Sequence, residues 1–220
     1  MKKLLTVTIL VFALAVSMVP AVFAADTNYT TCMAAISEQR DIQDQAHRTA
    51  QLLRTQGHGD SSPYIVAAKS TWSEAQDAIV GYQKLAQYTD EDIRILATTV
   101  YYEAGNTTEE LRQYVAQVVM NRVGDSRFPN TVKAVVTQPG QYAQKYATVE
   151  AAQSIKDKDA QNGTYTYLTC ENAAKQAMMG LVDMPSNVLY QANFRQGSGT
   201  WKSVYFNSGW YASTSYFCYG

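Results

Sequence analysis

Apolar side chains recur three or four residues apart through an otherwise polar stretch, from Asn28 to Gln87, and this spacing is typical of amphipathic helices. The stretch is interrupted once, at 57–63, where glycines and a proline favour a turn. We therefore expect a helical hairpin that packs as an appendage on a main domain, with binding of a partner protein as the alternative role. The expected apolar stripes are Ala35, Ile36, Ile42, Ala46, Ala50 and Leu53, followed by Ile65, Ala68, Trp72, Ala75, Ile79, Tyr82 and Leu85.

Acidic residues mark the start of a further helix. Thr89 is a favourable N-cap, and the carboxylates at 90–92 favour the positive end of a helix dipole. The pattern predicts a helix from there to about Ala104, ended by a glycine and an asparagine. Residues 107–110, Thr-Thr-Glu-Glu, then predict a capping box for a helix that runs to about Val123.

The second half of the chain changes from helical to extended patterns. Residues 132–137 form a short apolar segment that is either helix or strand, and a helix is expected over about 171–179, ended by Gly180. From Asp183 onward, short apolar alternations lie among Tyr, Ser, Asn and Gly, which is typical of short strands and loops. The expected fold class is α+β and predominantly helical, with a small late strand and loop region.

The first residues have the pattern of a secretory signal peptide. Two lysines precede an apolar run that ends near Ala24, with small side chains suited to cleavage after that residue. We expect a signal peptide at 1–24, the helical hairpin at 25–88 and the main domain at 89–220. The mature chain is then secreted and has no stable membrane span, whereas an uncleaved membrane anchor is the alternative.

The charge of the mature chain bears on its partners. Cleavage would remove two lysines and change the formal net charge from −1 to −3. Such a chain lacks the basic excess that binding to a phosphate backbone requires. Nucleic acid is therefore not an expected partner.

Three cysteines are an odd number, so at least one thiol stays unpaired in a monomer. We expect Cys170 to pair with Cys218, since both lie in the C-terminal half, and Cys32 to be free; free buried thiols are the alternative. None of them lies in a metal-ligand spacing such as Cys-x-x-Cys. No metal site and no organic cofactor are expected.

Glu103 stands out on the helix predicted from Thr89 to Ala104. A helical wheel groups five apolar residues on one face: Ile93, Leu96, Ala97, Val100 and Ala104. Glu103 falls about 20° from Leu96, at the edge of that face. Burial there, and the negative end of the helix dipole, would both raise the pKa of a carboxyl group and let it deliver a proton near neutral pH. A salt bridge to Arg94 or Arg122 is the structural alternative.

Residues 101–104, Tyr-Tyr-Glu-Ala, are similar to the Tyr-x-Glu-Ala motif of the SleB-type cell-wall hydrolases, which include spore-cortex-lytic enzymes. Residues 115–123 resemble the family's helix that ends in Asn-Arg-Val, and 128–138 resemble its next block. Gln141-Tyr142, residues 177–180, and Leu189-Tyr190 with Asn193 match weaker elements further on. An ordered series of this kind is far more specific than one short motif.

The resemblance covers the chain from about Asp90 onward and has two departures. The family commonly closes with His-x-Phe-Tyr, whereas this chain has Ser-Tyr-Phe-Cys at 215–218. The block from Tyr146 to Tyr167 also diverges. These departures concern the details of substrate recognition, since Glu103 is retained.

The resemblance implies a lysozyme-like fold and cleavage of the β-1,4 bond between N-acetylmuramic acid and N-acetylglucosamine in peptidoglycan glycan strands. An ordinary glycosidase uses a second carboxylate, and none accompanies Glu103 in the matched motifs. A single carboxyl group suffices if it acts as general acid and then as general base for the sugar's own 6-hydroxyl, which is the lytic transglycosylase reaction. A muramidase-type hydrolase is one alternative.

Five further residues are candidates for the substrate groove. Aromatic faces contact the apolar surfaces of sugars, and amides bond to hydroxyl and acetamido groups. On this ground the substrate-binding candidates are Tyr101, Gln141, Tyr142, Tyr190 and Asn193. Each could instead be a core tyrosine or a turn amide.

Other functions are less compatible with the residues present. A zinc amidase needs His and carboxylate or thiolate ligands, and a cysteine nucleophile needs a histidine. The chain has only His47 and His58, both in the predicted hairpin outside the region of resemblance. A non-catalytic module that binds the cell wall on the same fold remains the alternative from a different class.

Overall fold

The structure is a computed structural model that describes residues 28–209 and 211–220. The predicted signal peptide, 1–24, lies outside the described residues and stays a prediction. None of the described helices is both long and apolar enough to cross a membrane.

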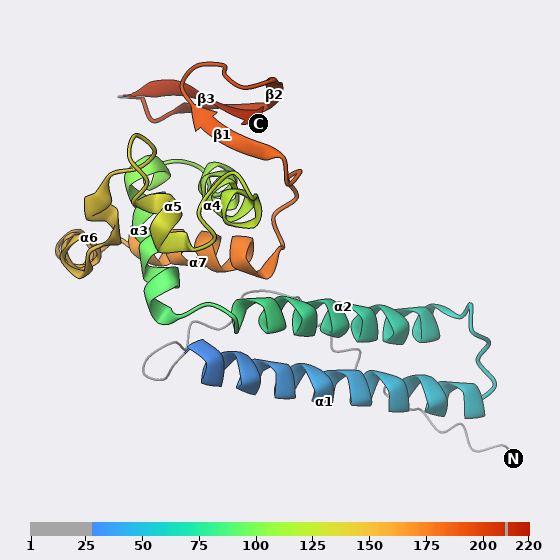
Figure 1. Cartoon of the computed structure of the whole chain (residues 1–220). Coiled ribbons are helices and arrows are strands. Elements are labelled where there is room, and N and C mark those ends of the chain that lie inside the picture. Colours follow the sequence, from blue (N-terminus) through green and yellow to red (C-terminus); the bar gives the residue numbers. More distant parts are fainter. Residues whose placement is uncertain (1–27, 210) are drawn as a thin grey trace, which may run out of the picture.

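Two long helices form the predicted hairpin: α1 (Asn28–Thr55) and α2 (Pro63–Leu85), which lie side by side over their length (Figure 1). The hydroxyl of Ser62 accepts a hydrogen bond from the backbone N–H of Ile65 (3.3 Å), and Pro63 occupies the first helical position, so the start of α2 is capped as its sequence favours. The apolar stripes pack between the helices with one exception. Trp72 is 44% exposed, so its placement in the stripe was wrong.

The central helix is α3 (Asp90–Ala104), as predicted. Thr89 caps it through a complete capping box, in which its hydroxyl accepts from the N–H of Asp92 and the Asp92 carboxylate accepts from the N–H of Thr89. Every residue of 95–100 is buried, because other elements surround this part of α3. Figure 1 shows α3 at the middle of the helical layer.

The next helices follow the prediction with one difference. Helix α4 (Glu109–Gly124) begins after Thr108, whose hydroxyl accepts from the N–H of Leu111 (3.2 Å). The N-cap is thus one residue later than the predicted capping box over 107–110 requires, and Leu111 has no side-chain oxygen to return the bond, so the predicted box is absent. The apolar segment left open between helix and strand is helix α5 (Val132–Val136).

A polar region between α5 and α7 contains two helices that the sequence patterns did not predict. They are the 3₁₀ helix η1 (Gln144–Ala147) and α6 (Val149–Asn162). Helix α7 (Thr166–Met179) begins five residues before the predicted start and ends at Gly180, whose positive φ of 74° gives the expected stop.

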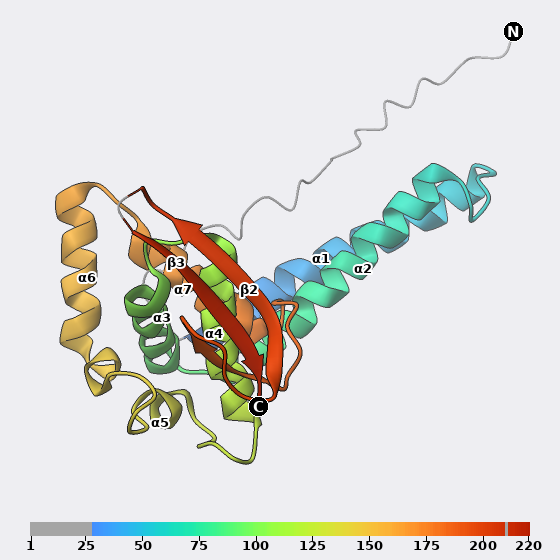
Figure 2. The ribbon, with the colours of Figure 1, turned by 90° about the horizontal axis from the view of Figure 1, so that it is seen from above.

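The last quarter of the domain is a three-stranded antiparallel sheet in the order β1-β3-β2. Its strands are β1 (Val188–Ala192), β2 (Gly199–Asn207) and β3 (Ala212–Tyr219). The sheet covers α3 and α4 on the side opposite to the hairpin (Figures 1 and 2). The predicted fold class, α+β and predominantly helical with a small late sheet, is confirmed.

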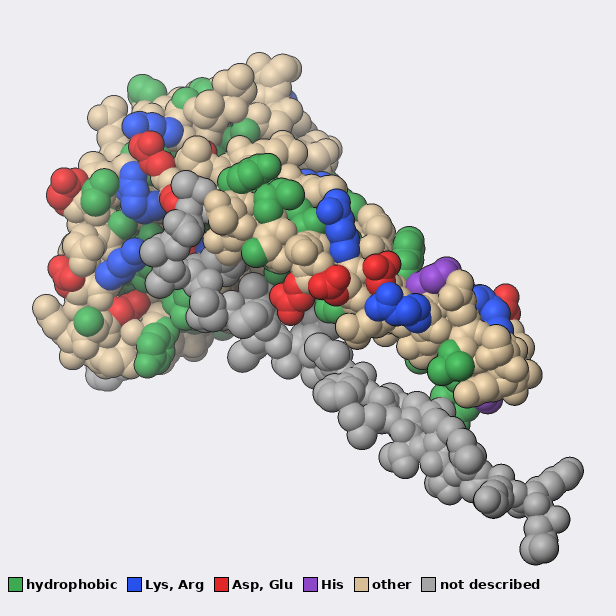
Figure 3. All heavy atoms as spheres, turned by 90° about the horizontal axis from the view of Figure 1, so that it is seen from below, with side chains coloured by type: hydrophobic (Ala, Val, Ile, Leu, Met, Phe, Trp, Pro, Cys, Tyr) green, Lys and Arg blue, Asp and Glu red, His purple; other side chains and the backbone are tan. Residues whose placement is uncertain are grey.

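The hairpin joins the rest of the molecule at one end and extends away from it at the other (Figure 2). The side-chain amide of Asn28 donates hydrogen bonds to the carbonyls of Leu85 and Tyr88, each 2.7 Å long, and Cys32 and Leu85 are part of the main core. Seen from below, acidic and basic side chains are interspersed along the visible surface, which therefore shows no large area of one charge (Figure 3). The division of the chain at residue 88 remains a prediction.

All three cysteines are buried and free, so the predicted pairing of Cys170 with Cys218 is wrong. Cys170 lies on α7 in the helical layer, whereas Cys218 lies on β3 in the sheet, next to the hydroxyl of Thr200 (3.7 Å). The two thiols thus lie in different layers of the fold. Burial raises the pKa of Cys170 to about 12, which keeps its thiol protonated and unreactive.

Candidate active site

Glu103 lies in the last turn of α3, at the point where the chain leaves the helix. The N–H of Gly105 donates to the carbonyl of Tyr101 (2.8 Å) and closes that turn. A Cβ atom at position 105 would lie 2.6 Å from the same carbonyl oxygen, so a glycine is required there. The turn fixes the backbone on which the Glu103 carboxyl group is held.

The Glu103 side chain is accessible to solvent, yet its pKa is raised above the ordinary value. The main cause is desolvation by the surrounding protein, which disfavours the charged form, and a hydrogen bond from Tyr146 acts in the opposite direction. No second carboxyl group among the described residues contributes to this shift. The site therefore presents to solvent a carboxyl group that holds its proton to higher pH than usual.

Neither arginine considered as a salt-bridge partner hydrogen-bonds to Glu103. The guanidinium of Arg94 donates to the carbonyls of Ala147 (3.1 Å) and Thr148 (2.6 Å). Arg122 donates to the carbonyl of Leu189 (2.7 Å). Both cations thus support backbone segments.

Two tyrosines absent from the sequence-based candidates border Glu103. The rings of Tyr102 and Tyr146 stack with centroids 4.5 Å apart and an angle of 4° between their planes. The Nζ of Lys145 lies 5.3 Å from the centroid of the Tyr102 ring. Tyr146 comes from η1, a short helix with no capping side chain, so no sequence signal placed it here.

Two of the predicted groove residues, Tyr142 and Tyr190, meet at Arg122. The Arg122 guanidinium is almost fully buried and lies 5.4 Å and 5.9 Å from the centroids of these two rings, and 5.3 Å from that of Phe128. The Tyr142 hydroxyl is buried without a hydrogen-bond partner among the described residues. Desolvation raises the pKa of Tyr142 to about 12, against the influence of Arg122, and the charge of Glu103 raises it further, which places this ring within electrostatic range of Glu103.

The other three candidates are arranged differently. Tyr101 packs against the hydrophobic core, and desolvation by burial is the main cause of its raised pKa. Asp159 on α6 and Cys170 on α7 add to the rise, so Tyr101 lies on the helical side of the domain. Gln141 and Asn193 are exposed in connecting segments. Among the described residues, no hydrogen bond joins the side chain of any of these three to Glu103.

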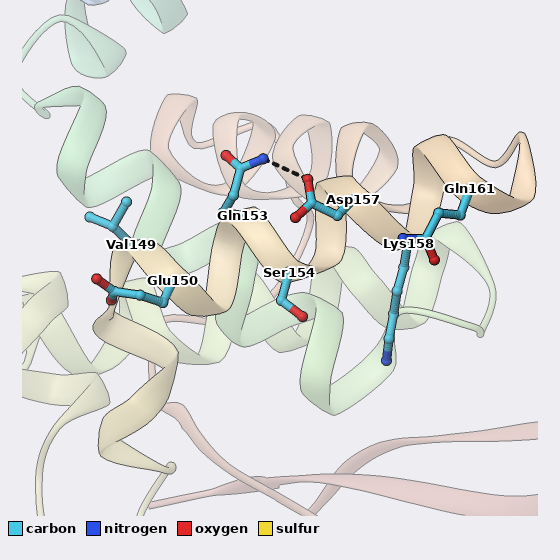
Figure 4. A pocket seen from close by; sticks show the side chains of 7 residues that line it. All are labelled: Val149, Glu150, Gln153, Ser154, Asp157, Lys158 and Gln161. Carbon is cyan, nitrogen blue, oxygen red and sulfur yellow. Dashed lines mark hydrogen bonds between the residues drawn. The ribbon is translucent and has the colours of Figure 1, made fainter.

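A surface hollow lies apart from this site, along α6. Its lining residues are Val149, Glu150, Gln153, Ser154, Asp157, Lys158 and Gln161 (Figure 4). All seven come from one helix, and Gln153 donates a hydrogen bond to Asp157 (2.8 Å). A hollow lined by one helix offers no converging groups for a ligand. Within residues 28–209 and 211–220, no group of three or more His, Cys, Asp or Glu could hold a metal ion.

The fold and the site define a helical α+β protein with one solvent-accessible carboxyl group of raised pKa at the end of its central helix. Residues 106–213 match the model of the cell wall hydrolase family, and the match begins just after Glu103. This match supports the resemblance to the SleB-type cell wall hydrolases.

Curated relatives are spore cortex-lytic enzymes. The chain is 29% identical to the enzyme of Bacillus cereus over 117 residues, which are 52% of this chain and 39% of that relative. It is 36% identical to the enzyme of Bacillus subtilis over 64 residues, which are 29% of this chain and 21% of that relative. The chain thus spans about two fifths of the first relative's length. Among solved structures, the catalytic domain of the germination-specific lytic transglycosylase SleB from Bacillus anthracis is similar, with 23% identity, a TM-score of 0.39, and coverage of 60% of this chain and 96% of that one.

Proposed function

We propose that this protein cleaves the β-1,4 bond between N-acetylmuramic acid and N-acetylglucosamine in peptidoglycan, as a lytic transglycosylase. The cell wall hydrolase domain and the spore cortex-lytic relatives support the substrate class. The observation that carries the mechanism is the raised pKa of an accessible Glu103. A carboxylic acid that is protonated at a higher pH than usual can act as a general acid.

In the proposed reaction Glu103 acts twice. Its protonated carboxyl group first donates the proton to the glycosidic oxygen, and the bond from that oxygen to C1 of N-acetylmuramic acid breaks. The resulting carboxylate then accepts the proton of the 6-hydroxyl of the same sugar as O6 bonds to C1. The products are a shortened glycan and a 1,6-anhydro sugar end, and Glu103 is protonated again. No second carboxylate is required, which agrees with the surroundings of Glu103.

The aromatic group around Arg122 is the proposed wall for the sugar rings. Tyr142 and Tyr190 each lie against the Arg122 guanidinium, 5.4 Å and 5.9 Å from ring centroid to Cζ, which favours rings that are fixed before substrate arrives. Gln141 and Asn193 are exposed in neighbouring segments and provide amide groups for acetamido and hydroxyl contacts. Tyr101 packs on the core and supports α3 instead.

The site of action follows from the substrate. We infer that the protein works outside the cytoplasmic membrane, because peptidoglycan lies there and residues 1–24 have the pattern of a signal peptide. Binding of a partner protein through the hairpin α1–α2 stays a prediction.

The test compares three purified proteins on peptidoglycan from vegetative walls and from spore cortex: the native chain, Glu103→Gln and Glu150→Gln. Glu150 is an exposed carboxylate on α6 and provides a matched loss of one charge away from the site. Mass spectrometry of released fragments should show anhydro-muropeptides from the native chain and Glu150→Gln, and none from Glu103→Gln.

Two other outcomes would contradict the proposal. Fragments with ordinary reducing ends would identify a muramidase-type hydrolase. Failure of the native chain to release fragments from either wall, combined with retention on insoluble peptidoglycan, would identify a wall-binding module.

A further inference from the structure

The 3₁₀ helix η1 is attached to α3 at two points. Near the start of α3, the Arg94 guanidinium donates hydrogen bonds to the carbonyls of Ala147 and Thr148, at the end of η1. Two turns further along, the Tyr102 ring stacks on the Tyr146 ring. Since both attachments come from the helix that carries Glu103, η1 is fixed relative to the Glu103 carboxyl group.

The stack determines how Tyr146 is presented. Two rings that lie 4.5 Å apart and almost parallel restrict each other's rotation. The neighbouring Lys145 also reaches Tyr102, with its Nζ 5.3 Å from the ring centroid. Two consecutive residues of η1 thus hold the same ring of α3. The Tyr146 hydroxyl and the Glu103 carboxyl group interact, since each shifts the pKa of the other.

We propose that Tyr146 is a positioning residue, which holds the Glu103 carboxyl group in its reactive orientation through the phenol hydroxyl, with Tyr102 as its support. This inference rests on the proposed function of Glu103. The hydroxyl donates to one carboxyl oxygen and leaves the other free to face the glycosidic bond. After proton transfer, the same hydroxyl stabilises the carboxylate that must next act as base.

Other ionisable groups near Glu103 are accounted for. Tyr142, from the segment before η1, responds to the charge of Glu103, but its hydroxyl has no hydrogen-bond partner among the described residues. Lys145 lies over Tyr102. Among the described residues, the interaction with Tyr146 is what opposes the desolvation of Glu103.

The test removes the hydroxyl and keeps the ring, with Tyr146→Phe. Tyr165→Phe is the matched control, because Tyr165 is 75% exposed and lies outside the site. We expect Tyr146→Phe to lower kcat about tenfold or more, because the carboxyl group loses its orientation. KM should change little, because the contacts of the substrate are kept. Carbon-13 NMR titration of the Glu103 side chain should show a higher pKa than in the native chain, because the lost hydrogen bond lowers it.

A second variant, Tyr102→Leu, keeps the hydroxyl of Tyr146 and removes the stacked ring. It should shift the pKa of Glu103 in the same direction, by a smaller amount. The inference is overturned if Tyr146→Phe leaves both kcat and the Glu103 titration as in Tyr165→Phe. The two proposals can fail separately. Full activity of Glu103→Gln would refute the proposed function. The contact between Tyr146 and Glu103 would still be measurable, because the NMR titration does not depend on turnover.

Discussion

Glu103 combines solvent access with a raised pKa, two properties that oppose each other in an ordinary surface carboxylate. An exposed carboxylate is usually well hydrated and ionised at neutral pH. Here the surrounding protein removes enough water to favour the neutral form, while the hydrogen bond from Tyr146 limits the effect. A group in this condition can both release and recover a proton, which the proposed reaction requires of it.

Replacement of Glu103 by Gln should make the fold more stable at neutral pH while removing activity. Because the pKa of Glu103 is raised in the folded state, its favourable contribution is present below the unfolded pKa and is lost as the pH rises through the folded pKa. The amide has no charge to desolvate. Thermal unfolding of both proteins from pH 4 to pH 8, a range set by ordinary carboxyl values near about 4.3, should show a difference that grows with pH.

The opposite trend would contradict the raised pKa. If the native chain became more stable than Glu103→Gln as the pH rose, the carboxylate would be stabilised by the fold. Glu150→Gln serves as the control, and its difference from the native chain should not follow this pattern.

At the scale of single residues, the sequence singled out Glu103 as the candidate acid, which stays a prediction, and gave no sign of Tyr146 beside it. The helical period places Glu103 at the edge of the apolar face, and the structure shows the desolvation that this position implies. Tyr146 could not be found in this way, because it reaches Glu103 from a 3₁₀ helix of four residues without a cap. The same holds for the meeting of Tyr142 and Tyr190 at Arg122, which depends on how β1 packs against α4.

Among the elements, α4 and β1 are joined by two buried polar residues. The side-chain amide of Asn121 donates to the carbonyls of Pro185 and Val188, each at 2.9 Å, and Arg122 donates to that of Leu189. These carbonyls lie at the start of β1 or just before it. The Asn-Arg-Val motif, read in the sequence as a family signature, therefore has a structural role in seating the sheet on the helices.

Asn121→Ala should lower the free energy of unfolding by about 1–3 kcal/mol, because it leaves buried carbonyl groups without donors. Urea unfolding followed by circular dichroism would measure the change. Asn130→Ala, at an exposed position, is the control and should change the stability little. Equal stability of the two variants would show that the Asn121 bonds do not hold the sheet.

Elements with their own local signals were predicted and those without them were missed. Helix α3 has a complete capping box, and α7 ends at a glycine of positive φ, which is why both features were found. The start of α7 was placed too late because its N-cap, Tyr165, makes no capping hydrogen bond. Helix α6 has only two buried residues, Ala152 and Ile155, so its sequence lacks an apolar stripe.

For the whole molecule, the three cysteines give a direct check of the packing. All three are buried and free, and burial raises the pKa of Cys32 and Cys170. We expect the native chain to react slowly with a thiol reagent and to expose three reactive thiols when unfolded without reductant. A count of one thiol under those conditions would show that two of the cysteines form a disulfide, as the sequence suggested for Cys170 and Cys218.

The arrangement of hairpin, helical layer and sheet was only partly accessible from the sequence. The apolar period predicted α1 and α2, but not that their joined end shares the main core through Cys32 and Leu85 while the other end extends away. Such long-range packing leaves no local pattern. The hydrogen bonds of Asn28 to Leu85 and Tyr88 likewise join positions far apart in the chain.

The central claim is that Glu103 alone provides acid and base and that the sugar's 6-hydroxyl is the nucleophile. Digestion of peptidoglycan in water enriched in oxygen-18, with a muramidase as the control, tests it most directly. The account predicts that fragments released by this protein end in anhydro sugars without the heavy isotope, and that Glu103→Gln releases none. Incorporation of one heavy oxygen at each new end, as in the muramidase digest, would contradict the account, because water would then be the nucleophile.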